Sequence, residues 1–195
     1  MKVLVLSPYP EGILPAFDVT GDTAVVHSDG IDPAFLEAKG IEHVVSYGYR
    51  RILREETLDC LPGRMVNLHY SLLPWNRGAD SNFWSFFDDT PKGVTVHVID
   101  AGVDTGPVLA QAEVHFSDTE TLATSYWLLR ERVEQLFIEN WSGIRNGTVT
   151  PVPQSGPGSY HRSADKEPFF ELLPDGWETP VSIVEEIGAR HRAGG

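Results

Sequence analysis

The chain has 195 residues and a formal net charge of −13, with 28 Asp and Glu against 15 Lys and Arg. That length suits one domain with a hydrophobic core, and the acidic balance argues against nucleic acid as the main partner. Cys60 is the only cysteine, which excludes an internal disulfide and fits a reducing compartment. No apolar run has the length of a signal peptide or a membrane-spanning helix. We therefore expect a cytoplasmic protein that binds neither nucleic acid nor a membrane.

Short apolar runs, rich in leucine and β-branched residues, have the length of buried strands. They comprise residues 2–6, 23–27, 43–47, 65–69, 93–99 and 108–116. Between the first two runs, residues 8–21 contain three prolines and leave room for only one turn of helix. This segment also lacks the GxGxxG fingerprint, so we do not expect a dinucleotide cofactor there.

Helical patterns fill most of the other intervals. They comprise residues 32–39, 52–60, 81–87, 117–146 and 179–191. The long fourth helix is expected to begin at Ser117, because Ser117 and Glu120 have the spacing of a capping box. Proline, glycine and serine dominate residues 148–160, which predicts a loop. The third helix carries four aromatic residues that we interpret as core rather than as a binding platform, namely Phe83, Trp84, Phe86 and Phe87.

Strands that alternate with helices predict an α/β fold with a mainly parallel sheet flanked by helices. In such sheets ligands bind at the carboxyl ends of the strands. Asn67 and His69 end the run 65–69, and side chains two residues apart on a strand leave the same face. Asp104 follows the run 93–99, just before a glycine turn. The sequence therefore predicts that an amide, an imidazole and a carboxylate converge, without an obvious serine or cysteine nucleophile among them.

Each of these three residues has a structural alternative when it is taken singly. Asn67 could cap a loop, and His69 could be an interior histidine with satisfied hydrogen bonds. We expect His97 to support the site from its strand rather than to act in catalysis. A zinc site built from His69, His97 and Asp104 is conceivable, but the sequence shows no recognised metal-ligand spacing, so we expect no metal.

Three motifs combine in this chain, namely Asn67-x-His69-x-Ser71-Leu72-Leu73-Pro74, Gly93-x-Thr95-x-His97 and Asp104-x-Gly106. The combined pattern resembles the folate-dependent formyltransferases, which include glycinamide ribonucleotide, methionyl-tRNA and amino-sugar formyltransferases. The resemblance covers residues 44–146. Within the family, the chain is most similar to the formylation domains that begin some nonribosomal peptide synthetases, such as linear gramicidin synthetase. One departure is Tyr70, where many relatives carry proline. Besides the three motifs, the resemblance includes the segments Ser46-Tyr47-Gly48-Tyr49, Trp75-Asn76 and Thr90-Pro91-Lys92.

The resemblance implies a Rossmann-like formyltransferase fold with residues 1–147 as the catalytic domain. Residues 148–195 would form a short C-terminal extension, a loop and a short helix that pack on the same domain. It also implies transfer of a formyl group from N10-formyltetrahydrofolate to a primary amine. Asn67 and a protonated His69 would donate hydrogen bonds to the oxyanion. Asp104 would favour the protonated form of His69 and could take the proton that the amine loses.

The same resemblance suggests which residues bind the two substrates. The donor pocket would involve Arg51, Leu53, Ile99, Asp100 and Val103. The acceptor side would involve Ser71, Trp75, Asn76 and Arg77, although Arg77 could instead pair with Asp80. We expect the loop 75–80 and the segment 154–161 to border the amine together.

The acceptor stays open between a carrier-bound aminoacyl group, an amino-sugar nucleotide and a small biosynthetic amine. A methionyl-tRNA acceptor fits poorly with the acidic chain and the lack of a large second domain. A formyltetrahydrofolate hydrolase is an alternative within the same chemistry. A folate- or nucleotide-binding module without turnover is an alternative of another class. The sequence predicts no oligomeric state.

Overall fold

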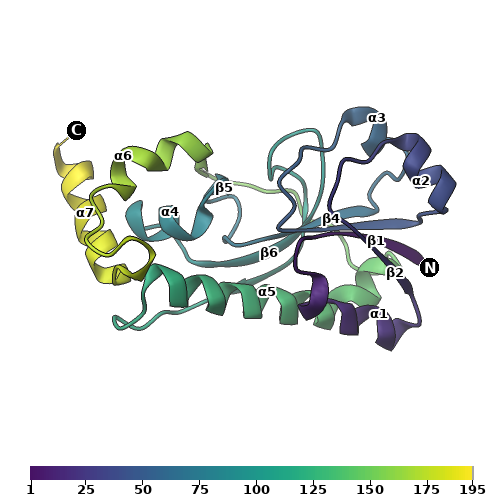
Figure 1. The fold of residues 1–195 in the computed structure, drawn as a ribbon, viewed down its shortest axis with the longest axis horizontal. Coiled ribbons are helices and arrows are strands. Elements are labelled where there is room, and N and C mark those ends of the chain that lie inside the picture. Colours follow the sequence, from purple (N-terminus) through teal and green to yellow (C-terminus); the bar gives the residue numbers. More distant parts are fainter. Residues whose placement is uncertain (195) are drawn as a thin grey trace. The chain divides into compact units, whose positions relative to one another are not determined.

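The computed structural model describes residues 1–194 (Figure 1). The chain divides into two compact units, which we call unit 1 and unit 2. Unit 1 comprises residues 1–69, 95–110 and 133–154, and unit 2 comprises residues 70–94, 111–132 and 155–195. The division at residue 147 that the sequence suggests stays a prediction.

The main sheet has six strands in the order β2-β1-β3-β4-β6-β7. The first four run parallel to their neighbours, whereas β4 and β6 are antiparallel. The expected mainly parallel α/β sheet is therefore confirmed. Four predicted strands have the expected bounds, and β6 and β7 end one and three residues earlier than expected. The strands are β1 (Lys2–Leu6), β2 (Thr23–His27), β3 (His43–Tyr47), β4 (Met65–His69), β6 (Gly93–Val98) and β7 (Val108–Glu113).

Both faces of the unit 1 strands are covered by helices (Figure 1). Helices α2 (Pro33–Lys39) and α3 (Glu55–Leu58) lie over one face, where Leu36 and Leu58 pack with residues of β1, β3 and β4. On the other face, α1 (Leu14–Thr20) packs Phe17 against Phe137 and Trp141 of helix α5 (Leu122–Arg145). This sandwich fixes the strand ends that carry the predicted catalytic residues.

Two helix predictions in unit 1 were wrong. The segment 8–21 was expected to hold one turn of helix, but it forms the 3₁₀ turn Pro10–Gly12 and the seven-residue α1. Pro15 lies in the first turn of α1, where no amide donor is needed. The expected helix 52–60 shrinks to α3, because Ile52 is 81% exposed and has no packing to hold it in a helix.

Burial of His43 makes the stability of unit 1 sensitive to acid. Its ring packs edge-on against Trp141, with the centroids 5.0 Å apart. Loss of hydration on burial lowers the pKa of His43 from 6.5 to about 4. The unfolded chain takes up this proton near the ordinary pKa and the folded chain only near the lowered one. Between these values the unfolded state holds more protons, so the free energy of unfolding falls as the pH falls.

We expect this residue alone to remove about 3 kcal/mol of stability between pH 6.5 and 4. The His43→Asn variant should lose that part of the pH dependence, whatever its stability at neutral pH. Urea unfolding at several pH values measures both. His115→Asn, at an exposed histidine, is the control and should keep the wild-type slope. Equal slopes in all three proteins would contradict the assignment to His43.

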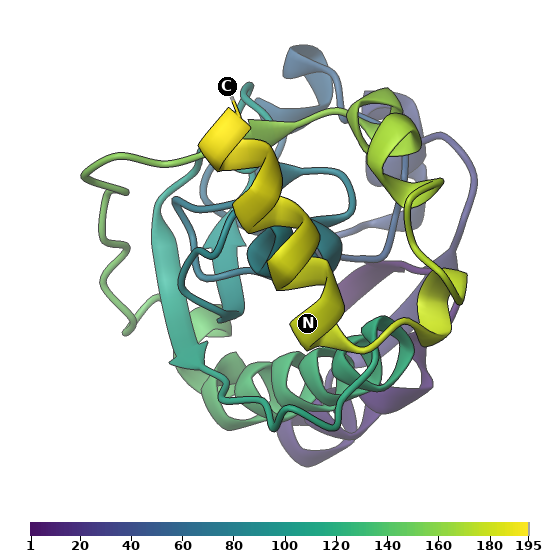
Figure 2. The same cartoon turned by 90° about the vertical axis from the view of Figure 1, so that its left-hand side faces the viewer.

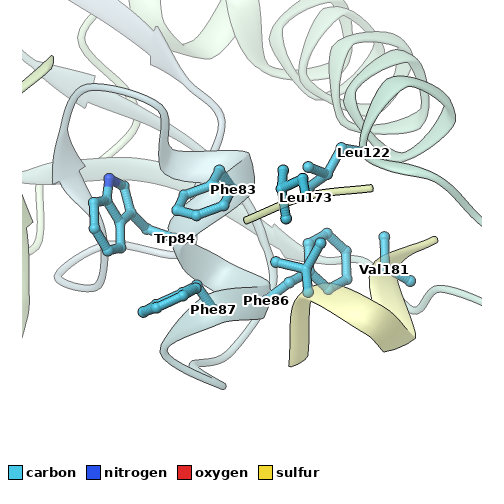
Figure 3. Packing of buried hydrophobic residues seen from close by; sticks show 8 residues of the cluster. Phe83, Trp84, Phe86, Phe87, Leu122, Leu173 and Val181 are labelled. Carbon is cyan, nitrogen blue, oxygen red and sulfur yellow. The ribbon is translucent and has the colours of Figure 1, made fainter. Parts of the chain in front are cut away.

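The core of unit 2 forms around α4 (Ser81–Phe87), all of whose residues are buried. Its four aromatic side chains are core, as expected, and they pack with Leu122, Leu173, Val181 and Val184 (Figure 3). Val181 and Val184 belong to α7 (Val181–Gly194), which lies against α4 (Figure 2). The polar residues of this buried helix have partners too, since Ser81, Asn82 and Ser85 each donate a side-chain hydrogen bond to a carbonyl.

The remaining elements of unit 2 are short. The C-terminal segment adds the 3₁₀ turn Ser163–Lys166, α6 (Glu167–Phe170) and the 3₁₀ turn Gly176–Glu178. Strands β5 (Arg77–Gly78) and β8 (Tyr160–His161) form a second, two-stranded parallel sheet. Two-residue strands have no periodicity, so the sequence patterns did not predict them.

The start of α5 differs from the prediction by a few residues. Thr121 and Thr124 exchange hydrogen bonds between their hydroxyls and backbone amides, at 2.8 and 3.2 Å. This reciprocal pair is the capping box, so the helix begins at Leu122. Ser117 and Glu120 form a backbone hydrogen bond of 3.1 Å and a side-chain contact of 3.4 Å, but neither side chain caps the amide of the other residue. The predicted long helix is confirmed, and its predicted cap is not.

Candidate active site

Antiparallel pairing of β4 with β6 places the first two predicted catalytic residues. Asn67 lies opposite His97, and His69 lies opposite Thr95. Because side chains alternate along a strand, Asn67, His69 and His97 share one face of the sheet. The loop 99–107 follows β6 and returns Asp104 to this face. All of these residues belong to unit 1.

The carboxylate of Asp104 lies among the three other side chains. Its Oδ2 is 3.6 Å from Nδ1 of His69, and its Oδ1 is 3.5 Å from Nε2 of His97. Asn67 donates a 3.3 Å hydrogen bond from Nδ2 to Oδ1. The side chains of His69, His97 and Asp104 are 8%, 3% and 14% exposed. The structure therefore brings Asn67, His69 and Asp104 together and adds His97 to the set.

Hydrogen bonds fix the tautomer of His97. Its Nδ1 lies 2.9 Å from the carbonyl oxygen of Val98, and a carbonyl only accepts, so Nδ1 carries the proton. In the neutral ring Nε2 is then an acceptor, and Asn67 Nδ2 lies 3.2 Å from it. Both N–H groups of the Asn67 amide are thus directed at Asp104 and His97. His97 orients Asn67, which agrees with the expected supporting role.

The Asp104 backbone is held in an uncommon conformation. Its φ is 53°, in the left-handed region that aspartate tolerates better than most residues. Gly106 follows it, and a Cβ there would lie 1.8 Å from the Val98 carbonyl oxygen, so only glycine fits. Asp100 closes the loop by accepting bonds from the Gly102 amide at 3.1 Å and the Thr105 hydroxyl at 2.6 Å.

The residues predicted to bind the donor all lie in unit 1. Leu53 and Ile99 pack against the apolar cluster that contains Leu6 and Met65. Val103 is 39% exposed. The Asp100 side chain is used within its own loop, as described above. Arg51 is largely exposed and forms an ion pair of 3.5 Å with Asp29. This position is compatible with a solvated arginine and with an arginine that contacts a ligand.

The residues predicted for the acceptor side lie in unit 2 and shape one loop. Ser71 is buried and donates a 2.6 Å hydrogen bond to the carbonyl of Trp75. Asn76 is fully buried, has a φ of 54° and donates to the Thr90 hydroxyl at 2.7 Å. These two side chains therefore hold the loop, and Trp75 and Arg77 are partly exposed.

The C-terminal segment binds this loop directly. Ser159 accepts a hydrogen bond from the Asn76 amide at 2.8 Å and donates to the Asn76 side chain at 3.0 Å. The Arg77 amide donates to the Ser159 carbonyl at 3.0 Å, and β5 then pairs with β8. Ser159 is a structural anchor that no sequence signal identified, because its partner is 83 positions away. The two segments expected to border the acceptor are thus neighbours.

Asp80 and His161 fix the two ends of this arrangement. Asp80 forms a 2.8 Å ion pair with Lys166. The His161 ring stacks on Trp84 with the centroids 3.8 Å apart, and its Nε2 lies 2.8 Å from Oδ2 of Asp88. These contacts attach His161 to α4 and to Asp88, which follows it, and Lys166 to the loop 75–80.

Unit 2 also contains a cavity of about 510 Å³ that holds none of the predicted site residues. Phe86, Lys92 and Glu185 are among its lining residues, and the Lys92–Glu185 ion pair measures 3.3 Å. Within residues 1–194, no group of His, Cys, Asp or Glu side chains has the arrangement of a metal site. No helix in that range is long and apolar enough to cross a membrane.

Comparison with known proteins defines the class. A family model described as formyl transferase matches residues 30–140. The chain therefore belongs to the folate-dependent formyltransferase family, as its motif indicated. Methionyl-tRNA formyltransferases of Thermodesulfovibrio yellowstonii and Corynebacterium glutamicum are 35% and 33% identical over 68% and 77% of this chain. The matches cover only 43% and 46% of those proteins, so the chain spans less than half of their length.

A solved structure matches nearly the whole chain. It is the formyltransferase PseJ from Anoxybacillus kamchatkensis, in complex with UDP-4,6-dideoxy-4-formamido-L-AltNAc and tetrahydrofolate. The two chains are 41% identical with a TM-score of 0.89, over 94% of this chain and 97% of PseJ. A 4-N formyltransferase from Francisella tularensis has a TM-score of 0.76 at 18% identity, over 96% and 85% of the chains, and shares the fold.

Proposed function

We propose that this protein transfers a formyl group from N10-formyltetrahydrofolate to the primary amine of an amino-sugar nucleotide. The observation that carries the proposal is the similarity to PseJ over almost the whole of both chains. That relative holds a formamido-sugar nucleotide and tetrahydrofolate, which are the two products of such a transfer. The cluster of Asn67, His69 and Asp104 supplies the groups that this reaction needs.

In the proposed reaction the neutral amine forms a bond to the formyl carbon, and the carbonyl oxygen becomes an oxyanion. Protonated His69 and Asn67 stabilise this oxyanion by hydrogen bonds. Because both N–H groups of Asn67 are directed at Asp104 and His97, the oxyanion must replace one of these partners. Both bonds are long, at 3.3 and 3.2 Å, so the exchange costs little.

Collapse of this intermediate breaks the bond between the formyl carbon and N10 of the folate. The amine loses one proton, and N10 gains one as it leaves. Asp104 accepts the proton from the amine, directly or through a water molecule. The carboxylate already accepts the hydrogen bond of Asn67 and faces Nδ1 of His69, and a protonated His69 stabilises its charge. No covalent intermediate with the protein is required, since the amine is the nucleophile.

We assign the donor to the side of unit 1 formed by Leu53, Ile99 and Val103. These apolar side chains suit a flat pterin ring, and the adjoining main chain of Asp100 offers polar groups for its edge. Ile52 beside them is 81% exposed, which provides further apolar surface. We assign Arg51 to the border of this site, where its guanidinium group would face the solvent-exposed part of the folate.

We assign the acceptor to the loop 75–80 together with residues 155–161, the part of the expected segment that lies in unit 2 with this loop. The loop follows His69 directly in the chain, and its hydrogen bonds with Ser159 give it a fixed shape. A fixed loop with an arginine suits the diphosphate of a nucleotide sugar. A carrier-bound aminoacyl group would need a protein-binding surface beside it, so we rank it second. The net charge of −13 disfavours tRNA.

The test is a formyl-transfer assay followed by mass spectrometry. The protein is incubated with N10-formyltetrahydrofolate and, separately, a UDP-linked amino sugar, an aminoacyl carrier protein and a free amino acid. The expected result is a formylated nucleotide sugar and tetrahydrofolate in equal amounts. Formylation of only the aminoacyl carrier protein would mean that the acceptor is a carrier-bound aminoacyl group and not a nucleotide sugar. Loss of the formyl group to water without any amine would identify a hydrolase. Folate binding without turnover on any acceptor would indicate a binding module.

Replacing Arg77 by alanine tests the two binding sides. We expect the Michaelis constant for the amine to rise on the order of tenfold, because a charge-assisted hydrogen bond is lost. The dissociation constant of the folate should change by less than about twofold. Steady-state kinetics and folate titration measure the two separately. Arg190→Ala is the control, since Arg190 is an exposed arginine of α7 that pairs with Glu186. A similar rise in both constants would mean that Arg77 only holds the loop. A selective loss of folate affinity would mean that the donor, and not the acceptor, binds beside Arg77.

A further inference from the structure

The side chain of Gln154 binds the backbone of the loop that carries Asp104. Its Nε2 donates one hydrogen bond of 2.8 Å to the carbonyl of Asp104 and a second of 2.8 Å to the carbonyl of Gly106. One amide group thus uses both N–H bonds on two carbonyls, two residues apart. Gln154 is partly buried and belongs to unit 1, as does the loop.

The loop needs such a support because its key residue is in an unfavourable conformation. A non-glycine residue with a φ of 53° costs about 1 kcal/mol or more relative to ordinary backbone. The direction of the Asp104 carbonyl depends on ψ of that residue, so a hydrogen bond to the carbonyl fixes the backbone from which the carboxylate projects. The bonds of Asp100 hold Gly102 and Thr105, on either side of Asp104. Gln154 supplies the bond at Asp104 itself.

Gln154 is itself placed by main-chain pairing. Val152 and Val108 exchange two backbone hydrogen bonds of 2.8 Å in an antiparallel bridge. The Val98 amide donates to the Pro107 carbonyl at 2.9 Å, which ties the end of the loop to β6. Residues two apart on an extended chain have the same orientation, so the bridge at Val152 also sets the side on which Gln154 lies.

We propose that Gln154 is a positioning residue for Asp104, which keeps the carboxylate between His69 and His97 through the backbone of Asp104. The inference rests on the proposed function, because it gives Asp104 its catalytic role. Gln154 contacts no reacting atom in this assignment. Its loss should therefore lower kcat and leave the affinities for folate and amine nearly unchanged, since a displaced catalytic group loses rate steeply with distance.

The test uses two substitutions of similar length. Gln154→Glu puts carboxylate oxygens against two carbonyl oxygens, and Gln154→Met removes the donors without adding charge. Each is expected to lower kcat at least about tenfold, with both Michaelis constants within about twofold of wild type. Asn140→Asp is the matched control, because Asn140 also donates its side-chain amide to a carbonyl in unit 1, that of Leu136 at 2.8 Å. It should keep the wild-type kcat.

Two further measurements separate positioning from a general structural role. In an Asp104→Asn background, Gln154→Met should cause no further loss of kcat, because its effect passes through the Asp104 carboxylate. The same fold loss in both backgrounds would overturn the proposal. Hydrogen exchange gives a readout that needs no turnover. Amides of residues 102–108 should exchange faster in both Gln154 variants and not in Asn140→Asp, with the strands of the sheet unchanged.

The exchange result also distinguishes this inference from the proposed function. If no acceptor is formylated but the loop exchanges faster in the Gln154 variants, the proposed reaction fails and the support of Asp104 stands. If wild type transfers the formyl group but the Gln154 variants keep their kcat and their loop protection, the proposed function stands and Gln154 does not position Asp104.

Discussion

Replacing His69 by alanine is expected to lower the turnover number on the order of a thousandfold. The imidazole faces Asp104 at 3.6 Å from a position that is almost closed to solvent. In the proposed reaction its charge stabilises the oxyanion, and alanine removes that charge together with the proton that the ring can move. Single-turnover formyl transfer to the amino-sugar nucleotide measures the effect without interference from product release.

Two further variants make the His69 result interpretable. His115→Ala removes an exposed histidine and should retain wild-type turnover. His69→Gln keeps a polar side chain at the buried position, so it separates loss of the imidazole from loss of packing. Thermal unfolding of each variant shows whether the sheet is intact. Turnover within a few fold of wild type in a folded His69→Ala protein would remove His69 from the mechanism.

Asp104→Asn is expected to lower the turnover number by roughly a hundredfold or more. Asparagine has nearly the shape of aspartate and also tolerates a positive φ, so the backbone at 53° should survive the change. What is lost is the negative charge between His69 and His97 and the ability to accept the proton of the amine. Nearly all of the effect should appear in kcat, as measured by steady-state kinetics with both substrates varied.

The chain offers a control with the same substitution in the same backbone conformation. Asp89 also has a φ of 53°, but it is exposed and lies 3.7 Å from Lys92 in unit 2. Asp89→Asn should therefore leave turnover unchanged, and equal losses in the two variants would trace the effect to net charge rather than to the site. A folded Asp104→Asn protein with normal turnover would mean that the carboxylate only supports the loop.

The sequence by itself determined the strands of the sheet and the class of chemistry. Buried parallel strands are continuous apolar runs, so β1, β3 and β4 were visible as such. The alternation of side chains along β4 was enough to place Asn67 and His69 on one face. The motif that contains them indicated the family, and the family model that matches residues 30–140 confirms it.

Local patterns were less informative where packing decides the outcome. The prolines of residues 8–21 were expected to leave room for only one turn of helix, yet α1 forms because Pro15 lies in its first turn and Phe17 is buried against α5. Conversely, the pattern 52–60 was helical in character but mostly exposed, and only four residues of it form α3. A short helix owes its stability to the face that it buries, which the sequence shows only in part.

Only the tertiary structure decided how the residues around the predicted site contact one another. His97 lies opposite Asn67 because β4 and β6 pair antiparallel in one register, and a shift of one residue would have sent it to the other face. The bonds from Gln154 to the Asp104 loop span 50 and 48 positions, and those from Ser159 to Asn76 span 83. Such bonds leave no periodic trace in the sequence, since each depends on the pairing of whole strands. The sequence therefore identified the family and predicted the reacting groups, and the long-range pairing of the folded chain determined how those groups are held.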